Sequence, residues 1–156
     1  MIICGAGGHA GELYHCFHDQ LKNFFFFDNL NLDRKEIFGK PVLHSIDEIK
    51  EIFKEDNRFL LGVGGVKQRA DFFSLMKNNG GEYFPIFADS FSNINSSPNF
   101  KADIFPYSFI GPNVKIGEAT LINTRSNIHH DTVIGQFCDI APAVTILGSV
   151  LIGDYT

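Results

Sequence analysis

The chain has 156 residues, 44% of them apolar, and a net charge of −5, values that are ordinary for one globular domain or two small ones. Its 13 Lys and Arg residues form no basic run, so we expect no nucleic-acid partner. No stretch approaches the ~18 apolar residues of a membrane span. We therefore expect no transmembrane segment. Three cysteines without metal or redox spacing, and an N-terminus without a charged leader, lead us to expect a cytoplasmic protein.

The first 90 residues alternate short apolar runs with segments of helical periodicity. We predict strands over residues 1–4, 24–27, 59–65 and 82–87, and helices over residues 12–21, 45–53 and 66–81. Ser45 and Glu48 form a capping box that starts the second helix, and Gly39 with Pro41 indicates a turn before it. This alternation predicts an α/β domain of residues 1–90, a Rossmann-like, mostly parallel sheet of about four strands.

Isoleucine recurs every six residues through the last third of the chain. A Ser-, Asn- and Pro-rich stretch precedes this repeat, and we expect residues 91–103 to form a linker or an irregular first coil. The period fits neither a helix nor a single strand, but it fits a chain that turns a corner every six residues and stacks its coils. The repeated positions are Ile104, Ile110, Ile116, Ile122, Ile128, Ile134, Ile140, Ile146 and Ile152.

The isoleucine repeat predicts a β-solenoid of about three triangular coils over residues 104–156. Three sixes make one coil, so residues 18 apart stack and the isoleucines form three inward ladders, beginning at Ile104, Ile110 and Ile116. The fifth residue of each six is small or β-branched, and we expect it to face inward as well. Glycine after isoleucine marks corners where we expect a positive φ, at Gly111, Gly117, Gly135 and Gly153.

The isoleucine repeat resembles the signature of the hexapeptide-repeat acyltransferases, Ile/Val/Leu-Gly followed by four residues. With the GAGGHAG turn of residues 5–11 before it, the chain resembles the bacterial sugar acetyltransferases, which include UDP-4-amino-sugar N-acetyltransferases and sialic acid O-acetyltransferase-like proteins. The resemblance implies a left-handed parallel β-helix and a homotrimer. It also implies acetyl-CoA bound between neighbouring helices and a nucleotide sugar held by the N-terminal domain.

One outward corner of the predicted solenoid carries His129, His130 and Asp131. Acetyl transfer needs a base that takes a proton from the attacking group, and imidazole titrates near neutral pH. The resemblance aligns the family's Glu-His-Asp with these residues, which makes His130 the catalytic base, His129 a replacement for the usual Glu, and Asp131 the candidate orienting residue. From the residues alone, an ordinary solvated histidine pair is the alternative. A metal site would lack a third ligand at a zinc spacing, so we expect no metal.

The 18-residue period also defines outer rows of the solenoid, among them Pro112–His130–Gly148 and Asn113–Asp131–Ser149. Small neighbours in the first row leave the imidazole accessible. In the family a second histidine contacts the acetyl group, and the comparable position here is Asp139. Asp139 and Gly148 are therefore our candidate residues for binding acetyl-CoA.

The ends of the predicted strands supply the candidate substrate site. The glycine-rich turn that begins at Gly5 follows the first strand, where the amides of a helix N-terminus suit a pyrophosphate. Asp28 and Asn29 end the second strand. Gly62 and Gly64 end the third. An Asx turn and close glycine packing are the alternatives, whereas a full dinucleotide site would need a larger fold and an acidic residue after the second strand. We therefore predict a UDP-sugar ligand. The candidates are Gly5, Gly7, Gly8, His9, Asp28, Asn29, Gly62 and Gly64.

These features predict an acetyl-CoA-dependent acetyltransferase that acts on the amino group of a UDP-4-amino sugar in surface-glycan biosynthesis. The alternatives are an O-acetyltransferase for a sialic-acid-type sugar and a non-catalytic, trimeric sugar-nucleotide-binding scaffold. The isoleucine repeat stops in mid-repeat at Thr156, where family members continue with further coils. Because an open solenoid end exposes unpaired strands, we expect either a truncated chain or one capped by a partner.

Overall fold

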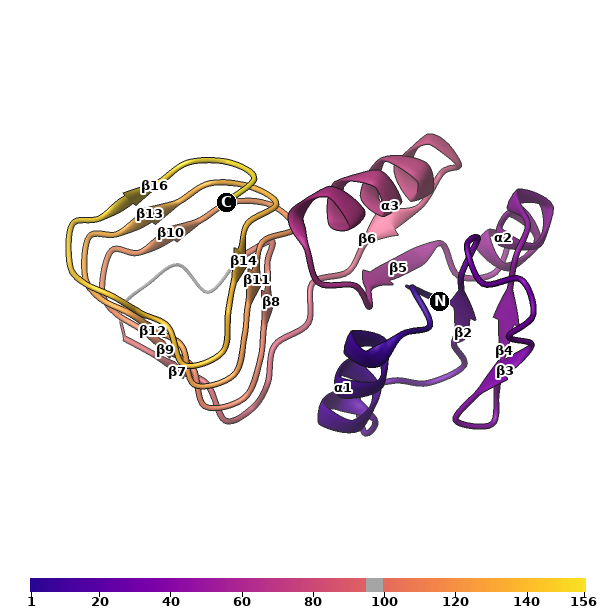
Figure 1. Ribbon diagram of the computed structural model, residues 1–156, viewed down its shortest axis with the longest axis horizontal. Coiled ribbons are helices and arrows are strands. Elements are labelled where there is room, and N and C mark those ends of the chain that lie inside the picture. Colours follow the sequence, from indigo (N-terminus) through magenta and orange to yellow (C-terminus); the bar gives the residue numbers. More distant parts are fainter. Residues whose placement is uncertain (95–99) are drawn as a thin grey trace. The chain divides into compact units, whose positions relative to one another are not determined.

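The computed structural model describes residues 1–94 and 100–156, which fall into two compact units (Figure 1). The first unit comprises residues 1–64 and 71–84, and the second comprises residues 65–70 and 85–156. The second unit thus starts before residue 90 and takes in the first residues of helix α3 (Val66–Asn78). Of the expected linker, residues 95–99 lie outside the described residues.

A six-stranded sheet with the order β3-β4-β2-β1-β5-β6 forms the first unit. The strands from β4 to β6 in this order run parallel, and β3 is antiparallel to β4. The predicted parallel sheet is confirmed, but a β3–β4 hairpin stands where only a turn was expected, with Phe38 and Gly39 at positive φ. The strands are β1 (Ile2–Cys4), β2 (Phe25–Phe27), β3 (Glu36–Ile37), β4 (Lys40–Leu43), β5 (Arg58–Leu61) and β6 (Glu82–Tyr83).

Three helices follow strands of this sheet: α1 (Gly8–Phe17), α2 (Ile46–Phe53) and α3. The capping box of α2 is confirmed, because the Glu48 N–H donates to Ser45 Oγ at 3.3 Å and the Ser45 N–H donates to Glu48 Oε2 at 2.9 Å. Within the described ranges, no helix has the length and apolar character needed to cross a membrane.

Several predicted element boundaries are wrong, most clearly those of the first helix and the last strand. In addition, β5 ends at Leu61 and α3 ends at Asn78, both earlier than predicted. Helix α1 begins at Gly8 and ends at Phe17, rather than spanning residues 12–21. Burial of Ala10 in the core outweighs the poor helix propensity of the glycines in its first turns. The last strand is shorter than predicted: β6 ends at Tyr83, and Phe87 forms a parallel bridge with Ile104 in the second unit.

The second unit is a parallel β-helix with a two-residue strand every six residues. Its sheets, β14-β11-β8, β15-β12-β9-β7 and β10-β13-β16, form the three sides of the triangle in Figure 1. The strands are β7 (Ser92–Asn93), β8 (Asp103–Ile104), β9 (Phe109–Ile110), β10 (Lys115–Ile116), β11 (Leu121–Ile122), β12 (Asn127–Ile128), β13 (Val133–Ile134), β14 (Asp139–Ile140), β15 (Thr145–Ile146) and β16 (Leu151–Ile152).

Ladders of isoleucine fill the centre of this β-helix, as predicted. Ile122, for example, pairs in register with both Ile104 and Ile140. Most of the ladder isoleucines are buried, and full burial of each is worth about 1.5–3 kcal/mol. The isoleucine repeat therefore provides the main apolar core of the unit.

The corners of the β-helix are formed by the fourth residue of each six, not by glycine. These nine non-glycine residues have φ between 54° and 63°: Tyr107, Asn113, Ala119, Arg125, Asp131, Phe137, Ala143, Ser149 and Tyr155. The positive-φ glycines lie elsewhere, so the predicted role of glycine after isoleucine is wrong. A Cβ on Gly117 would instead lie 2.4 Å from the backbone nitrogen of Gln136. Glycine is needed at this position so that the next coil can pack closely.

The start of α3 is fixed to the β-helix by two carboxylates of one sheet. Asp103 on β8 and Asp139 on β14 both pair in register with Leu121, which lies between them. Arg69 Nη2 lies 2.6 Å from Asp103 Oδ2, and neither side chain is exposed. The Gly65 N–H donates to Asp139 Oδ2 at 2.8 Å. Residues 65–70 therefore belong to the second unit through a buried ion pair and a charge-assisted hydrogen bond.

Candidate active site

His129, His130 and Asp131 form the corner between β12 and β13. The backbone of this corner is bonded to the coils on both sides. The Asp131 N–H donates to the Pro112 carbonyl at 3.0 Å, and the His130 carbonyl accepts from the Ser149 N–H at 2.8 Å. Asp131 has the left-handed conformation of the other corners, with φ of 61°. Hydrogen bonds to the neighbouring coils therefore fix the backbone of both His130 and Asp131.

His130 and Asp131 form a hydrogen-bonded pair. His130 Nδ1 lies 2.8 Å from Asp131 Oδ2, and Asp131 Oδ1 accepts from Asn113 Nδ2 at 3.0 Å. The hydrogen bond from His130 and then that from Asn113 hold the pKa of Asp131 below its ordinary value, so its carboxylate is ionised at neutral pH. An ionised partner at Nδ1 favours the tautomer with a proton on Nδ1, which leaves Nε2 as an acceptor. Nε2 can then take a proton from a substrate.

His129 does not take part in this hydrogen-bonded pair. Its ring lies 5.8 Å from the ring of Phe109, which is one coil earlier, whereas Asp131 bonds to His130. Within residues 1–94 and 100–156, no group of three His, Cys, Asp or Glu side chains could hold a metal ion. His130 and Asp131 are thus the predicted catalytic residues that the structure brings together.

The imidazole of His130 lies against Gly148 of the next coil. A Cβ on Gly148 would lie 2.5 Å from both Cε1 and Nε2 of His130, a distance that side-chain carbons do not tolerate. The His130 imidazole can therefore occupy this position because Gly148 has no side chain. This contact agrees with the predicted outer row of Pro112, His130 and Gly148.

We expect Gly148→Ala to lower kcat at least about tenfold, because it displaces the imidazole that is predicted to act as the base, and a small displacement of such a group is costly. The melting temperature should change little, since a half-exposed ring can move aside. Acetyl-transfer kinetics and thermal unfolding of the purified variant would measure the two effects. Gly153→Ala is the matched control, because a Cβ there meets none of the described residues within 4 Å. Unchanged kcat in the Gly148 variant would contradict the prediction.

Asp139 lies apart from this corner in the fold. It is on β14 in the sheet β14-β11-β8, whereas His130 follows β12 of the sheet β15-β12-β9-β7. Both of its carboxylate oxygens accept hydrogen bonds within the second unit, from the Gly65 N–H at 2.8 Å and from Asn123 Nδ2 at 3.0 Å. A carboxylate at the start of α3 also interacts favourably with the helix dipole. Asp139 thus holds the residue that precedes α3, and its role in binding acetyl-CoA stays a prediction.

The predicted substrate residues of the first unit lie along one edge of its sheet. Cys4 pairs with Phe27 and Leu61, and Phe27 pairs with Leu43. The residues that follow these strand ends, Gly5, Asp28, His44 and Gly62, are therefore level with one another at the carboxyl edge. Ligands of open parallel sheets bind at this edge.

The glycines at this edge have two different roles. Gly5 and Gly62 are packing residues, since a Cβ on Gly5 would lie 2.5 Å from Val63 Cγ1 and one on Gly62 would lie 2.8 Å from Ile3 Cγ2. Gly7 and Gly8 are exposed, and a Cβ on either meets none of the described residues within 4 Å. The turn therefore leaves space for a ligand at Gly7 and Gly8, just where α1 begins.

The remaining predicted residues lie around this turn. His9 Nδ1 is 3.5 Å from Glu12 Oε2, and Gly64, which follows β5 in the sequence, is partly buried. Asp28 Oδ1 accepts from the Leu30 and Asn31 N–H groups at 2.8 and 3.1 Å. Asp28 thus forms the Asx turn that the sequence offered as an alternative, and Asn29 is exposed within it.

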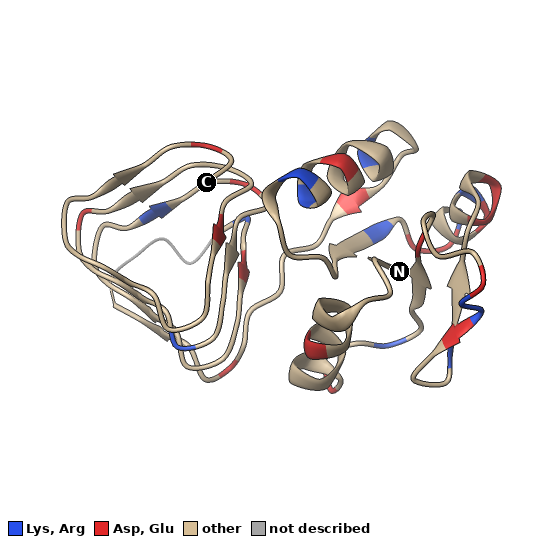
Figure 2. Cartoon of the chain, in the orientation of Figure 1, with Lys and Arg blue, Asp and Glu red and all other residues tan. Residues whose placement is uncertain are grey.

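Two residues at this edge were missed by the sequence analysis. Arg34 Nη1 donates to the carbonyl of Ala6, inside the glycine-rich turn. His44 Nδ1 donates to the Asp28 carbonyl at 2.7 Å, and its buried Nε2 has no hydrogen-bond partner among the described residues. Lys and Arg are dispersed among acidic residues (Figure 2), so no basic run singles out Arg34. The position of His44 directly after a strand was the available signal.

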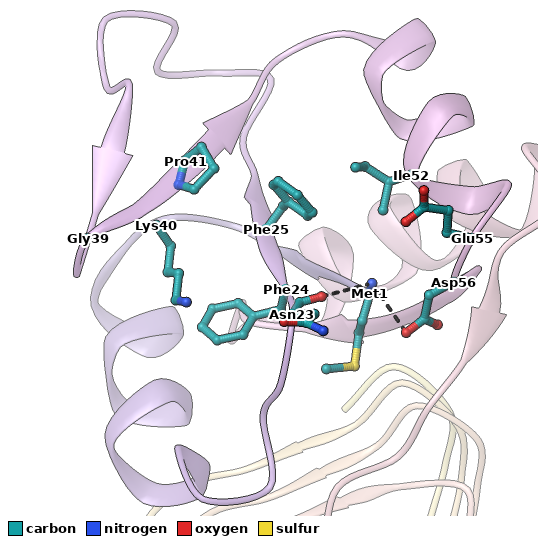
Figure 3. Close-up of a pocket in the computed structure, with 10 residues that line it drawn as sticks. All are labelled: Met1, Asn23, Phe24, Phe25, Gly39, Lys40, Pro41, Ile52, Glu55 and Asp56. Carbon is teal, nitrogen blue, oxygen red and sulfur yellow. Dashed lines mark hydrogen bonds and ion pairs between the residues drawn. The ribbon is translucent and has the colours of Figure 1, made fainter.

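A pocket of about 600 Å³ lies at the opposite edge of this sheet (Figure 3). Met1 and Phe24 precede β1 and β2 there, and the Met1 amino group lies 3.4 Å from Asp56 Oδ2. This pocket is therefore not formed by the predicted substrate residues. It is lined by Met1, Asn23, Phe24, Phe25, Gly39, Lys40, Pro41, Ile52, Glu55 and Asp56.

The chain is similar to known sugar-modifying proteins. Residues 1–76 match the family model of the PglD N-terminal domain, and no curated protein matches the chain. The perosamine N-acetyltransferase of Caulobacter crescentus, solved as a histidine-to-asparagine variant with CoA and GDP-perosamine, is 20% identical, with a TM-score of 0.82 over 96% of this chain and 72% of that one.

Two further solved structures have the same fold. WeeI from Acinetobacter baumannii AYE is 24% identical, with a TM-score of 0.79 over 98% of this chain and 74% of that one. The acetyltransferase domain of PglB from Neisseria gonorrhoeae FA1090, in complex with acetyl coenzyme A, is 16% identical, with a TM-score of 0.69 over 98% and 87%. These similarities confirm the predicted fold class, an α/β domain followed by a left-handed parallel β-helix, and the predicted resemblance to the sugar acetyltransferases.

Proposed function

We propose that the chain is an acetyl-CoA-dependent acetyltransferase that acts on the amino group of a nucleotide-activated sugar. The observation that carries this proposal is the pair of His130 and Asp131, in which a carboxylate that is ionised at neutral pH holds Nδ1 of an exposed imidazole at 2.8 Å. Solved proteins of the same fold are described with CoA and GDP-perosamine, or with acetyl coenzyme A. We propose that the substrate is a UDP-linked 4-amino sugar.

In the proposed reaction, the neutral sugar amine attacks the carbonyl carbon of the thioester. His130 Nε2 accepts the proton that the nitrogen loses as the C–N bond forms, and Asp131 stabilises the resulting imidazolium. The tetrahedral intermediate then collapses, the C–S bond breaks, and the imidazolium returns the proton to the leaving sulfur. The products are the N-acetyl sugar and CoA with a free thiol, so atoms and charge balance.

The experiment that tests this function offers the purified chain acetyl-CoA with one acceptor at a time. Acceptors are a UDP-linked 4-amino sugar, its GDP-linked counterpart and a sialic-acid-type sugar, and thiol release is the readout. We expect the fastest release with the UDP-linked amine. Faster release with the hydroxyl acceptor would instead identify an O-acetyltransferase. No release with any acceptor would contradict an enzymatic function and favour a sugar-nucleotide-binding scaffold.

We also propose that the active form is a cytoplasmic homotrimer with acetyl-CoA between neighbouring β-helices and Gly148 close to it. This assembly is the one that the family resemblance implies. Three free cysteines, Cys4, Cys16 and Cys138, suit a reducing compartment. Light scattering of the purified chain would give its mass, and a monomer with full activity would contradict the trimer.

The nucleotide sugar is proposed to bind at the carboxyl edge of the first unit, with its diphosphate at Gly7 and Gly8. Arg34 supports this placement, because its guanidinium reaches the Ala6 carbonyl with one of its nitrogens and retains further donors for phosphate oxygens. The Asx turn at Asp28 starts the loop that carries Arg34. His44, Asn29, His9 and Gly64 are the further candidates around the base, ribose and sugar.

Arg34→Met is expected to weaken binding of the nucleotide sugar by roughly tenfold or more, since a charge-assisted hydrogen bond contributes about 1.5–3 kcal/mol. Titration calorimetry at two salt concentrations would measure the loss and the smaller salt dependence. Lys35→Met is the matched control, because Lys35 Nζ is held by the Leu32 carbonyl of its own loop at 2.8 Å. Equal affinities of the Arg34 variant and the wild type would place the diphosphate elsewhere.

A further inference from the structure

Asn113 lies one coil before Asp131, at the same position of its six-residue repeat. Both residues are exposed corner residues, with φ of 60° and 61°. Asn113 Nδ2 donates to Asp131 Oδ1 at 3.0 Å across a sequence separation of 18 residues. The other carboxylate oxygen, Oδ2, is the one that contacts His130 Nδ1 at 2.8 Å. Three side chains from two neighbouring coils thus form one hydrogen-bonded chain.

We propose that Asn113 is a positioning residue for acetyl transfer: its amide holds the Asp131 carboxylate in the orientation that orients the His130 imidazole. This inference rests on the proposed function and adds to it a residue outside the His129–Asp131 corner. Asn113 does not touch the reacting atoms itself. It acts on the base through Asp131.

An exposed carboxylate rotates freely unless its oxygens are held. The Asp131 side chain is 51% exposed, so packing alone does not restrict its torsion angles. A hydrogen bond to each oxygen restricts these torsion angles, because rotation of the carboxylate would break the contact with His130, the contact with Asn113, or both. The Asp131 backbone is already fixed by the Pro112 carbonyl. Asn113 and His130 therefore each hold one of the two carboxylate oxygens.

A backbone role of Asn113 makes a different prediction. Asparagine tolerates the left-handed conformation well, and glycine tolerates it at least as well. If Asn113 served only to form the corner, Asn113→Gly would preserve both the fold and the activity. If its amide positions Asp131, the same substitution preserves the fold and lowers activity. Asn113→Gly therefore separates the two roles.

The test compares Asn113→Gly and Asn113→Asp with the wild type and with a matched corner variant, Ala143→Gly. Ala143 occupies the equivalent exposed corner, with φ of 61°, and lies outside the candidate site. We expect kcat to fall roughly 10- to 100-fold in Asn113→Gly, with KM for both substrates within about twofold. Asn113→Asp should lose more, because it replaces a donor by a second negative charge beside Asp131.

An NMR titration of the Asp131 carboxyl carbon supplies a readout that a purely structural role would not move. Loss of the Asn113 donor should raise the pKa of Asp131 toward its usual value, because Asn113 is one of the two groups that lower it. Unchanged kcat and an unchanged Asp131 titration in both variants, with an active wild type, would overturn the role of Asn113. An inactive wild type would overturn the proposed function, and the titration would then decide whether Asn113 holds the carboxylate.

Discussion

Replacing His130 by alanine is expected to lower kcat/KM for acetyl transfer by about 10²- to 10⁴-fold, because the variant lacks the base that we propose takes the proton from the attacking amine. The ring is 58% exposed, so its removal leaves no cavity in the core and should change the melting temperature little. Affinity for CoA and KM for the sugar should stay within about threefold, since the base acts mainly in the transition state. Thiol release with the purified variant measures the rate.

A matched control for this experiment is His18→Ala, which removes another exposed imidazole from the chain. It should retain the wild-type rate, because His18 follows α1 in the first unit and bonds to the His15 carbonyl. Asp131→Asn should give an intermediate loss, since an amide cannot stabilise the imidazolium as a carboxylate does. Full activity of the His130 variant would transfer the role of base to another group, with His129 the first to examine.

The isoleucine repeat allowed the strands and the core of residues 104–156 to be predicted. A strict six-residue period is explained by coils that stack residues 18 apart, and pairs such as Ile128 with Ile146 have that register. The corner conformation could not be predicted in the same way. The residues at positive φ include Tyr107, Ala119 and Phe137, which have no common preference for it. Closure of the coil imposes the conformation, and the isoleucine ladders stabilise it.

The contacts within the candidate site were easiest to predict where neighbours in the sequence form them. His130 and Asp131 are adjacent, and their hydrogen bond follows from one corner of known period. Residues brought together by the sheet of the first unit were harder to find, because Arg34 reaches Ala6 across 28 residues. In the second unit, Asp139 was proposed to bind acetyl-CoA from the family resemblance alone. Its hydrogen bond with Gly65 could not be predicted, because the two residues are 74 positions apart. Such contacts depend on the register of strands, which the sequence of a loop does not contain.

The substitution with the largest expected effect on stability is Arg69→Met. The side chains of Arg69 and Asp103 are both fully buried, and their closest atoms are 2.6 Å apart. Arg69 Nε also donates to the Ala119 carbonyl at 2.9 Å, and Asp103 Oδ1 accepts from the Ile86 N–H at 3.2 Å. Methionine fills the space of the aliphatic stem but leaves the buried carboxylate without its counter-charge. We expect a loss of about 3–5 kcal/mol, or roughly 6–20 °C in Tm.

A double-mutant cycle separates this loss into its causes. Asp103→Asn keeps the acceptor for Ile86 but leaves the Arg69 charge unpaired, so it should be costly as well. The double variant buries no charge, and its loss should be smaller than the sum of the two single losses by about 0.5–3 kcal/mol. Arg58→Met is the control, because Arg58 pairs with Asp56 at 2.8 Å on the surface and its removal should cost at most about 1 kcal/mol. Additive single losses in urea denaturation would contradict a coupled ion pair. The attachment of residues 65–70 to the β-helix would then depend on the Gly65–Asp139 hydrogen bond and on apolar packing.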